Sequence, residues 1–128
     1  MKRVTGLGGV FLKCNDPEAM YTWYEKHLGI KREHGTATFD WRQVEDPEKT
    51  GTTVWALFPQ TSKYFNPSTS PFMMNFRVEN LEQLLEALRS EGVQVDDKVE
   101  SHEYGKFGWI MDPEGNRIEL WEPPPEGN

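Results

Sequence analysis

The side chains of this sequence that could carry out chemistry are few, and they lie on the mixed faces of predicted strands. The ionisable members of this set are Lys13, Arg77, Arg117 and Glu119. A carboxylate between guanidinium groups is expected to be ionised, with a lowered pKa. Such a set could bind a carboxylate or phosphate, act as an acid–base cluster, or form a structural salt-bridge network. Asn75 could hydrogen-bond either a ligand or the backbone.

The histidines and the single cysteine show no spacing that is typical of a metal site. His27 lies in a helical pattern and His34 lies beside a turn glycine, so His102 is the histidine best placed to touch a ligand. The spacings HxxxH, HExxH and CxxC do not occur, and a metal needs several converging donors. Cys14 falls on the core-facing side of its strand, which argues against a nucleophile. The glycine run at 6–9 precedes a strand, so it is not a dinucleotide-binding motif.

Composition excludes several classes of protein. The chain has 128 residues, with 14 Lys and Arg against 21 Asp and Glu, so its formal charge is −7. This charge excludes a uniformly basic nucleic-acid binder. One cysteine cannot form an intrachain disulfide, and no run of about 18 apolar residues could span a membrane. No signal peptide is visible, so we expect one cytoplasmic domain over residues 1–128.

Hydrophobic periodicity and turn residues divide the chain into eight strands and two helices. Asp16 and Asn80 are predicted helix caps, and Gly29 and Gly92 are predicted helix ends. The predicted strands cover residues 9–14, 30–34, 36–44, 52–58, 72–79, 93–99, 106–111 and 117–122. Prolines bound the segment 59–71, which we interpret as a linker.

The order of these elements is β-α-β-β-β, repeated once. The two helix caps are 64 positions apart, and the two helix-ending glycines are 63 positions apart. This common register predicts a structural duplication, with modules at 1–58 and 72–123. The alternative is a single α+β domain without internal symmetry.

Strand alternation predicts a cavity on one face of the sheet. Each strand has one smoothly apolar face that suits packing against a helix, while the other face mixes small, aromatic and charged residues. The mixed faces carry Phe11, Met73 and Trp121, and also Trp109 if no bulge at Gly105 or Gly108 flips that strand. Plain solvated faces rarely hold so much apolar surface, so we favour the wall of an amphipathic cavity over a solvated sheet face.

Three segments resemble one known superfamily. They are residues 15–30, which combine Asn-Asp-Pro with Trp-Tyr-Glu-Lys-His-Leu-Gly-Ile, then 76–81, and lastly 112–122. The last is the most specific, because it joins an Asp-Pro-Glu-Gly-Asn turn to an Ile-Glu-Leu strand. The whole chain resembles the glyoxalase, bleomycin resistance and extradiol dioxygenase superfamily, also called vicinal oxygen chelate proteins. The resemblance implies an α+β fold of two βαβββ modules, whose curved mixed sheets enclose a cavity.

The resemblance also indicates where a metal would bind. Metal-dependent members place their ligands at positions that correspond to Gly9, Ala56, Met73 and Glu119. Of these, Glu119 alone keeps a ligand type, and one carboxylate cannot hold a divalent ion without further partners. We therefore expect no metal and no other cofactor, unlike in glyoxalase I and the iron or manganese dioxygenases.

Three functions are compatible with these observations. The first is metal-independent binding of a small organic ligand, as in the drug-sequestering members that the chain resembles. The second is a glyoxalase-class enzyme, such as a lactoylglutathione lyase-like protein, an isomerase or a dioxygenase, with Glu119 in acid–base chemistry or in an atypical metal site. The third is a protein whose cavity is vestigial and whose dimer interface matters. The resemblance further implies a homodimer. From the charge and the absence of a long apolar run, we expect neither nucleic acid nor membrane as a partner.

We expect the cavity lining to come from both modules. Tyr104 and Phe107 belong to a glycine-flanked flap over the mouth. The remaining predicted ligand-binding residues are Phe11, Val54, Phe58, Asn75, Arg77, Trp109, Arg117 and Trp121, around Glu119.

Overall fold

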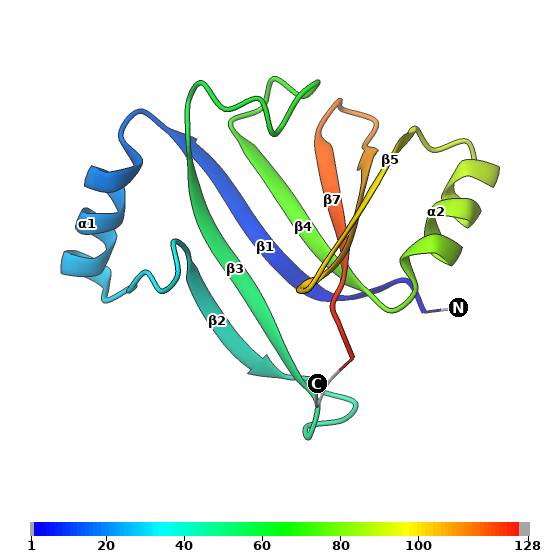
Figure 1. The fold of residues 1–128 in the computed structure, drawn as a ribbon, viewed down its shortest axis with the longest axis horizontal. Helices are drawn as coiled ribbons and strands as arrows, with labels where there is room; N and C mark the ends of the chain where they lie inside the picture. Colours follow the sequence, from blue (N-terminus) through cyan, green and yellow to red (C-terminus); the bar gives the residue numbers. More distant parts are fainter. Residues whose placement is uncertain (1, 126–128) are drawn as a thin grey trace.

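Seven strands form one mixed sheet in the order β2-β3-β1-β4-β7-β6-β5. A computed structural model describes residues 2–125. Figure 1 shows the sheet as a curved surface with α1 and α2 on its outer side, at opposite ends. The predicted α+β class with a curved mixed sheet is confirmed. The elements are β1 (Val4–Cys14), α1 (Pro17–Leu28), β2 (Ala37–Arg42), β3 (Thr50–Pro59), β4 (Phe72–Val78), α2 (Leu81–Ser90), β5 (Val95–His102), β6 (Gly105–Met111) and β7 (Arg117–Glu122).

The two halves of the chain use the same pairing and meet at the centre of the sheet. Strand β1 pairs in parallel with β3, just as β4 pairs in parallel with β7. The first strands of the two halves, β1 and β4, pair with each other in antiparallel fashion. The halves therefore share one sheet, and the residues on its inner face come from both.

The predicted helix ends are confirmed at both helices. The Asp16 side chain accepts a hydrogen bond from the Ala19 amide, and the Asn80 side chain accepts one from the Gln83 amide, each at 3.1 Å. Such bonds satisfy amides that have no partner inside the first turn. Gly29 follows α1 with φ at 70°, a conformation that glycine adopts without steric cost.

The predicted strand at 30–34 is wrong. In this segment the structure has one isolated bridge, between Glu33 and Thr36, so the first half contributes three strands to the sheet instead of four. The segment contacts α1 instead of a neighbouring strand. Arg32 makes two hydrogen bonds to the Glu18 carboxylate and stacks over the Tyr21 ring at 4.4 Å, which attaches the segment to α1.

Apolar side chains gather on both faces of the sheet. On the outer face, α2 packs through Leu81, Leu84 and Leu85 against Val78 and Leu120. The inner face has its own cluster, made of Phe11, Ala56, Phe65, Met73 and Trp109. The inner face is therefore an apolar floor, and the strand alternation described above accounts for it. No helix within residues 2–125 is long and apolar enough to cross a membrane.

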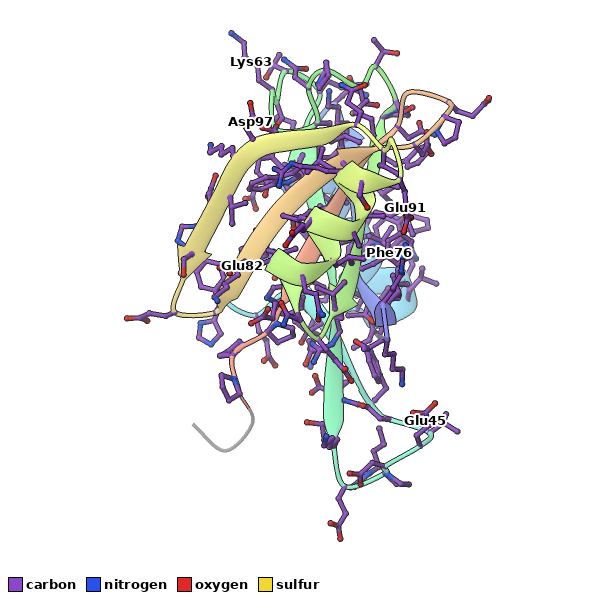
Figure 2. All side chains as sticks on the ribbon, turned by 90° about the vertical axis from the view of Figure 1, so that its right-hand side faces the viewer. Glu45, Lys63, Phe76, Glu82, Glu91 and Asp97 are labelled. Carbon is purple, nitrogen blue, oxygen red and sulfur yellow. The ribbon has the colours of Figure 1, made fainter. Side chains whose placement is uncertain are left out.

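The segment 59–71, which joins the two halves of the chain, packs into the core. Phe65 is fully buried in the inner cluster. The Lys13 amide donates to the Pro71 carbonyl, and Arg117 donates to the Tyr64 carbonyl, each at 2.7 Å. Figure 2 shows Lys63, in this segment, at the opposite end of the molecule from Glu45 in the β2–β3 connection. The segment therefore closes one end of the inner face.

Truncation of Phe65 tests this role of the segment. We expect Phe65→Ala to lower the free energy of unfolding by about 3–5 kcal/mol, because a fully buried ring leaves a cavity behind. The exposed neighbour Lys63 provides the control, since Lys63→Ala is expected to stay within about 0.5 kcal/mol of the parent. Urea unfolding followed by circular dichroism measures both. Equal stabilities of the two variants would contradict a core role for 59–71.

Candidate functional site

The inner face of the sheet holds a cavity of about 820 Å³. Small and aromatic side chains from both halves form most of its wall, and carboxylate, amide and imidazole groups interrupt them. The described lining residues are Gly8, Phe11, His34, Thr36, Val54, Ala56, Phe58, Tyr64, Asn75, Glu100, His102, Tyr104, Phe107, Glu119 and Trp121. This combination of apolar area with a few polar groups is typical of a site for a small organic molecule.

Glu119 is the polar centre of the cavity floor. It lies in β7 between β4 and β6, directly opposite Asn75 on one side and Trp109 on the other. The Asn75 amide donates to Oε1 at 2.6 Å, and the Trp109 indole N–H donates to Oε2 at 3.0 Å. The Tyr64 hydroxyl makes a further, short hydrogen bond to Oε2. Three strands and the segment 59–71 thus converge on one carboxylate that is 2 % exposed.

Burial dominates the electrostatics of this carboxylate. Desolvation raises the pKa of Glu119 above its ordinary value, although the hydrogen bonds from Tyr64, Asn75 and Trp109 act in the opposite direction. The prediction of a lowered pKa is therefore wrong, because the cost of burial outweighs the arginine. Arg117 contributes the smallest of the opposing effects. Burial and the adjacent Glu119 also raise the pKa of the Tyr64 hydroxyl, which keeps it a hydrogen-bond donor.

A bulge in β1 leaves room for the Asn75 side chain. Leu7 pairs with Phe76 and Gly9 pairs with Asn75, so Gly8 is the extra residue between them. A Cβ atom at Gly8 would lie 2.1 Å from Asn75 Oδ1, so glycine is required there. Among the described residues, this Oδ1 is the buried side-chain polar atom without a hydrogen-bond partner. The amide is therefore held by packing on one side and by Glu119 on the other.

Aromatic rings form two parallel pairs on the cavity wall. Phe58 of β3 stacks on Tyr64, with ring centroids 5.7 Å apart and an interplanar angle of 5°. Phe107 of β6 stacks on Trp121 of β7, with 6.0 Å between centroids and an angle of 4°. One pair involves the first half of the chain and the other belongs to the second half. A ligand in the cavity would therefore meet aromatic surface from both halves.

The predicted site residues separate into those that line the cavity and those that do not. Trp109 faces Glu119, as strand alternation requires, but it lies in the floor beneath the lining. Arg77 stacks between Trp41 and Trp121, with its guanidinium 5.5 and 5.0 Å from the two ring centroids. Arg117 donates to the Tyr64 carbonyl and to Asp96, outside the cavity. Those in the lining are Phe11, Val54, Phe58, Asn75, Tyr104, Phe107, Glu119 and Trp121.

Sequence reasoning missed Tyr64, which bonds to the central carboxylate. The prolines around 59–71 suggested a loop, and the adjacent aromatic residues Tyr64 and Phe65 were the signal that could have indicated a packed one.

Gly108, which we interpreted as one of the two glycines that flank a flap, has a packing role inside β6. A Cβ atom there would lie 3.0 Å from a Leu85 methyl group, so the glycine allows β6 to approach α2 closely.

The rim of the cavity carries a partly exposed group of polar residues on β5. Glu100 pairs with Lys98 at 2.8 Å and with His102 at 2.9 Å. The His102 ring stacks on Tyr104 at 5.0 Å, and the Trp121 indole donates to the Tyr104 carbonyl at 2.8 Å. His102 therefore lines the cavity at its edge, while its ring nitrogen is already engaged with a carboxylate.

The donor set for a metal is incomplete in this cavity. Within residues 2–125, no three or more His, Cys, Asp and Glu side chains converge as metal ligands do. Ala56 and Met73, at two of the positions inferred from the resemblance, are buried in the apolar floor. Protein donors hydrogen-bond to both oxygens of Glu119, two of them at Oε2 and one at Oε1.

Comparisons with known proteins agree with this architecture. A model of the Glyoxalase/Bleomycin resistance protein/Dioxygenase superfamily matches residues 6–120. Among solved structures, methylmalonyl-CoA epimerase from Mycobacterium tuberculosis has a TM-score of 0.64 and 23% identity, covering 98% of this chain and 93% of that one. A variant of the Streptomyces coelicolor epimerase, in complex with 2-nitronate-propionyl-CoA, has a TM-score of 0.71 and 16% identity, covering 95% and 99%. A superfamily member from Vibrio splendidus has a TM-score of 0.56 and 14% identity, covering 91% and 98%. No curated protein matches the chain.

The raised pKa of Glu119 predicts a specific dependence of stability on pH. Over the range between the ordinary and the raised pKa, the folded chain binds a proton that the unfolded chain has lost, so Glu119 favours folding less as pH rises. We expect the unfolding free energy of the parent minus that of Glu119→Gln to fall from about pH 4.5 upward and then level off. Urea unfolding at several pH values measures this difference, in which the other carboxyl groups cancel. A carbon-13 titration of the Glu119 carboxyl checks the pKa directly in the parent, and a value below the ordinary range would contradict the argument.

Proposed function

The chain belongs to the Glyoxalase/Bleomycin resistance protein/Dioxygenase superfamily, and we propose that it binds a small organic ligand in its inner cavity without a metal ion. One observation carries this proposal. The cavity is walled by aromatic rings, and protein donors from three directions hydrogen-bond to its central carboxylate. The site thus has the apolar area that retains a ligand and one polar group that orients it.

The residues present do not fit a metal of the kind that the superfamily resemblance implies. Hydrogen, methyl and thioether groups stand at Gly9, Ala56 and Met73, and hard or borderline divalent ions bind none of them well. At Glu119, the hydroxyl of Tyr64 and the indole of Trp109 supply the partial positive charge that a cation would otherwise provide. We propose that these donors replace the metal in this chain.

The apolar wall would supply most of the binding free energy. Apolar surface contributes about 25 cal/mol per Å² removed from water, and association costs offset much of the gain. Aromatic side chains add specific contacts, because flat ligands stack on them. We therefore assign affinity to the two stacked pairs, Phe58 with Tyr64 and Phe107 with Trp121, and orientation to Glu119.

Acid–base catalysis is the second candidate function, and the buried carboxylate is the observation that favours it. A glutamate with a raised pKa beside a tyrosine hydroxyl could move a proton at a carbon atom next to a carbonyl. The chain shares its fold with methylmalonyl-CoA epimerases. Incubation with methylmalonyl-CoA in D₂O discriminates the two functions. Deuterium incorporation that Glu119→Gln abolishes would favour catalysis, and its absence favours binding.

We propose a cytoplasmic homodimer as the assembly. Trp23 and Leu28 of α1 are 51% and 59% exposed, and Phe39 of the edge strand β2 is 47% exposed. A second copy could cover these side chains in a symmetric pair. Sedimentation velocity at micromolar concentration tests the pairing, and a monomer would contradict it.

Ligand binding is tested with the neutral fluorescent probe N-phenyl-1-naphthylamine. We expect its fluorescence to rise when it enters the cavity, with a micromolar dissociation constant. Val54→Trp fills the wall and is expected to weaken binding about tenfold or more, whereas Ala19→Trp adds the same side chain on exposed α1 and is expected to leave binding unchanged. No fluorescence change with the parent, or equal weakening by both variants, would contradict ligand binding in this cavity.

Elemental analysis tests the proposed independence from metal. Protein purified without chelators is expected to contain far less than one Zn, Ni, Fe or Mn per chain. Probe binding is expected to be unchanged after dialysis against EDTA. About one metal per chain, lost in Glu119→Gln, would overturn the proposal.

A further inference from the structure

We infer that the cavity selects organic cations, namely protonated amines carried on a flat apolar body. The inference rests on the proposed binding function and adds to it the charge and class of the ligand. Among the described lining residues, the formally charged side chains are Glu100 and Glu119, and neither lysine nor arginine is present.

The cationic side chains near the cavity are turned to other partners. Arg117 bonds to Asp96 and to the Tyr64 carbonyl, and Arg77 stacks between two tryptophan rings. Lys98 pairs with Glu100 at the rim. An anionic ligand would therefore find no guanidinium or ammonium group in the wall to replace its hydration, and it would meet a buried carboxylate on the floor.

Glu119 keeps capacity for one more hydrogen-bond donor. An ionised carboxylate offers about four acceptor positions on its two oxygens. Oε2 accepts from Tyr64 and Trp109, whereas Oε1 accepts from Asn75 alone among the described residues. A ligand ammonium that donates to Oε1 would complete the set with a charge-assisted bond in a site of low polarity.

The aromatic walls favour the same class of ligand. The faces of aromatic rings attract cations, and cages of several rings bind ammonium groups. The stacked pairs Phe58 with Tyr64 and Phe107 with Trp121 both line the cavity that contains Glu119. The flat body of the ligand would lie on these rings while its ammonium group meets the carboxylate. The net charge of −7 would add attraction at long range.

A series of three ligands with one aromatic body tests the inference. The cation is 2-(1-naphthyl)ethylamine, the neutral analogue is 2-(1-naphthyl)ethanol, and the anion is 1-naphthylacetate. Isothermal titration calorimetry at pH 7.5 is expected to give the cation an affinity at least about tenfold above that of the alcohol, with the anion weakest. In Glu119→Gln, the affinity for the cation is expected to fall to within about threefold of the affinity for the alcohol.

Matched variants separate a local effect from overall charge and from misfolding. Glu114→Gln removes the same charge at an exposed turn, and it is expected to keep the parent protein's ratio of cation affinity to alcohol affinity. Glu100→Gln changes a partly exposed rim residue, and it is expected to lower the ratio of cation affinity to alcohol affinity in part. It gives a second test if Glu119→Gln does not fold. Equal binding of cation and alcohol by the parent, or tighter binding of the anion, would overturn the inference and leave the proposed function standing. Failure of all three ligands and of N-phenyl-1-naphthylamine to bind would overturn both.

Discussion

The burial of one carboxylate, Glu119, is the constraint on which the arrangement of the inner face depends. A charged group without water needs partners, and here they come from parts of the chain that are far apart in sequence. Asn75 reaches it from β4, Trp109 from β6, and Tyr64 from the segment 59–71. The parallel pairing of β4 with β7 and the antiparallel pairing of β6 with β7 place two of these donors directly beside it. The strand order therefore positions two of the three donors to Glu119.

The packing around this centre explains several residues that touch no ligand. Gly8, the extra residue of the β1 bulge, is a glycine because the Asn75 amide occupies the space that a Cβ atom would fill. Arg117 holds the Tyr64 carbonyl, and its guanidinium lies 4.8 Å from the Trp109 ring centroid, so it fixes two of the three donors from behind. Its role is thus positioning, at a distance from the cavity itself. A dense shell of this kind limits how far the carboxylate can move when a ligand enters.

Local signals in the sequence predicted both helices and the strands correctly except at 30–34, whereas long-range contacts decided the site. Helix caps at Asp16 and Asn80 act within three residues, so sequence reasoning could find them. Strand alternation also placed Trp109 on the same face as Glu119. By contrast, Tyr64 reaches Glu119 across 55 positions, and the pKa of that carboxyl depends on burial that no local pattern reveals. The segment 30–34 failed as a strand because Arg32 found Glu18 and Tyr21 on the helix, a competition that strand propensity does not describe.

The energetics of Glu119 connect its burial with the charge of a ligand. Desolvation raises its pKa even though three donors and an arginine act against this effect, so burial makes the ionised form costly. Apolar residues of similar volume often replace buried ionic groups without loss of stability, so folding alone gives little reason to keep a carboxylate here. A cation that enters the cavity would bring the opposite charge to a group that has already lost its water. Folding has already met the cost of removing water from the Glu119 carboxylate, so binding would have to meet only the cost of removing water from the ammonium. The ammonium would then bind where the dielectric is low and its attraction to the carboxylate is strong.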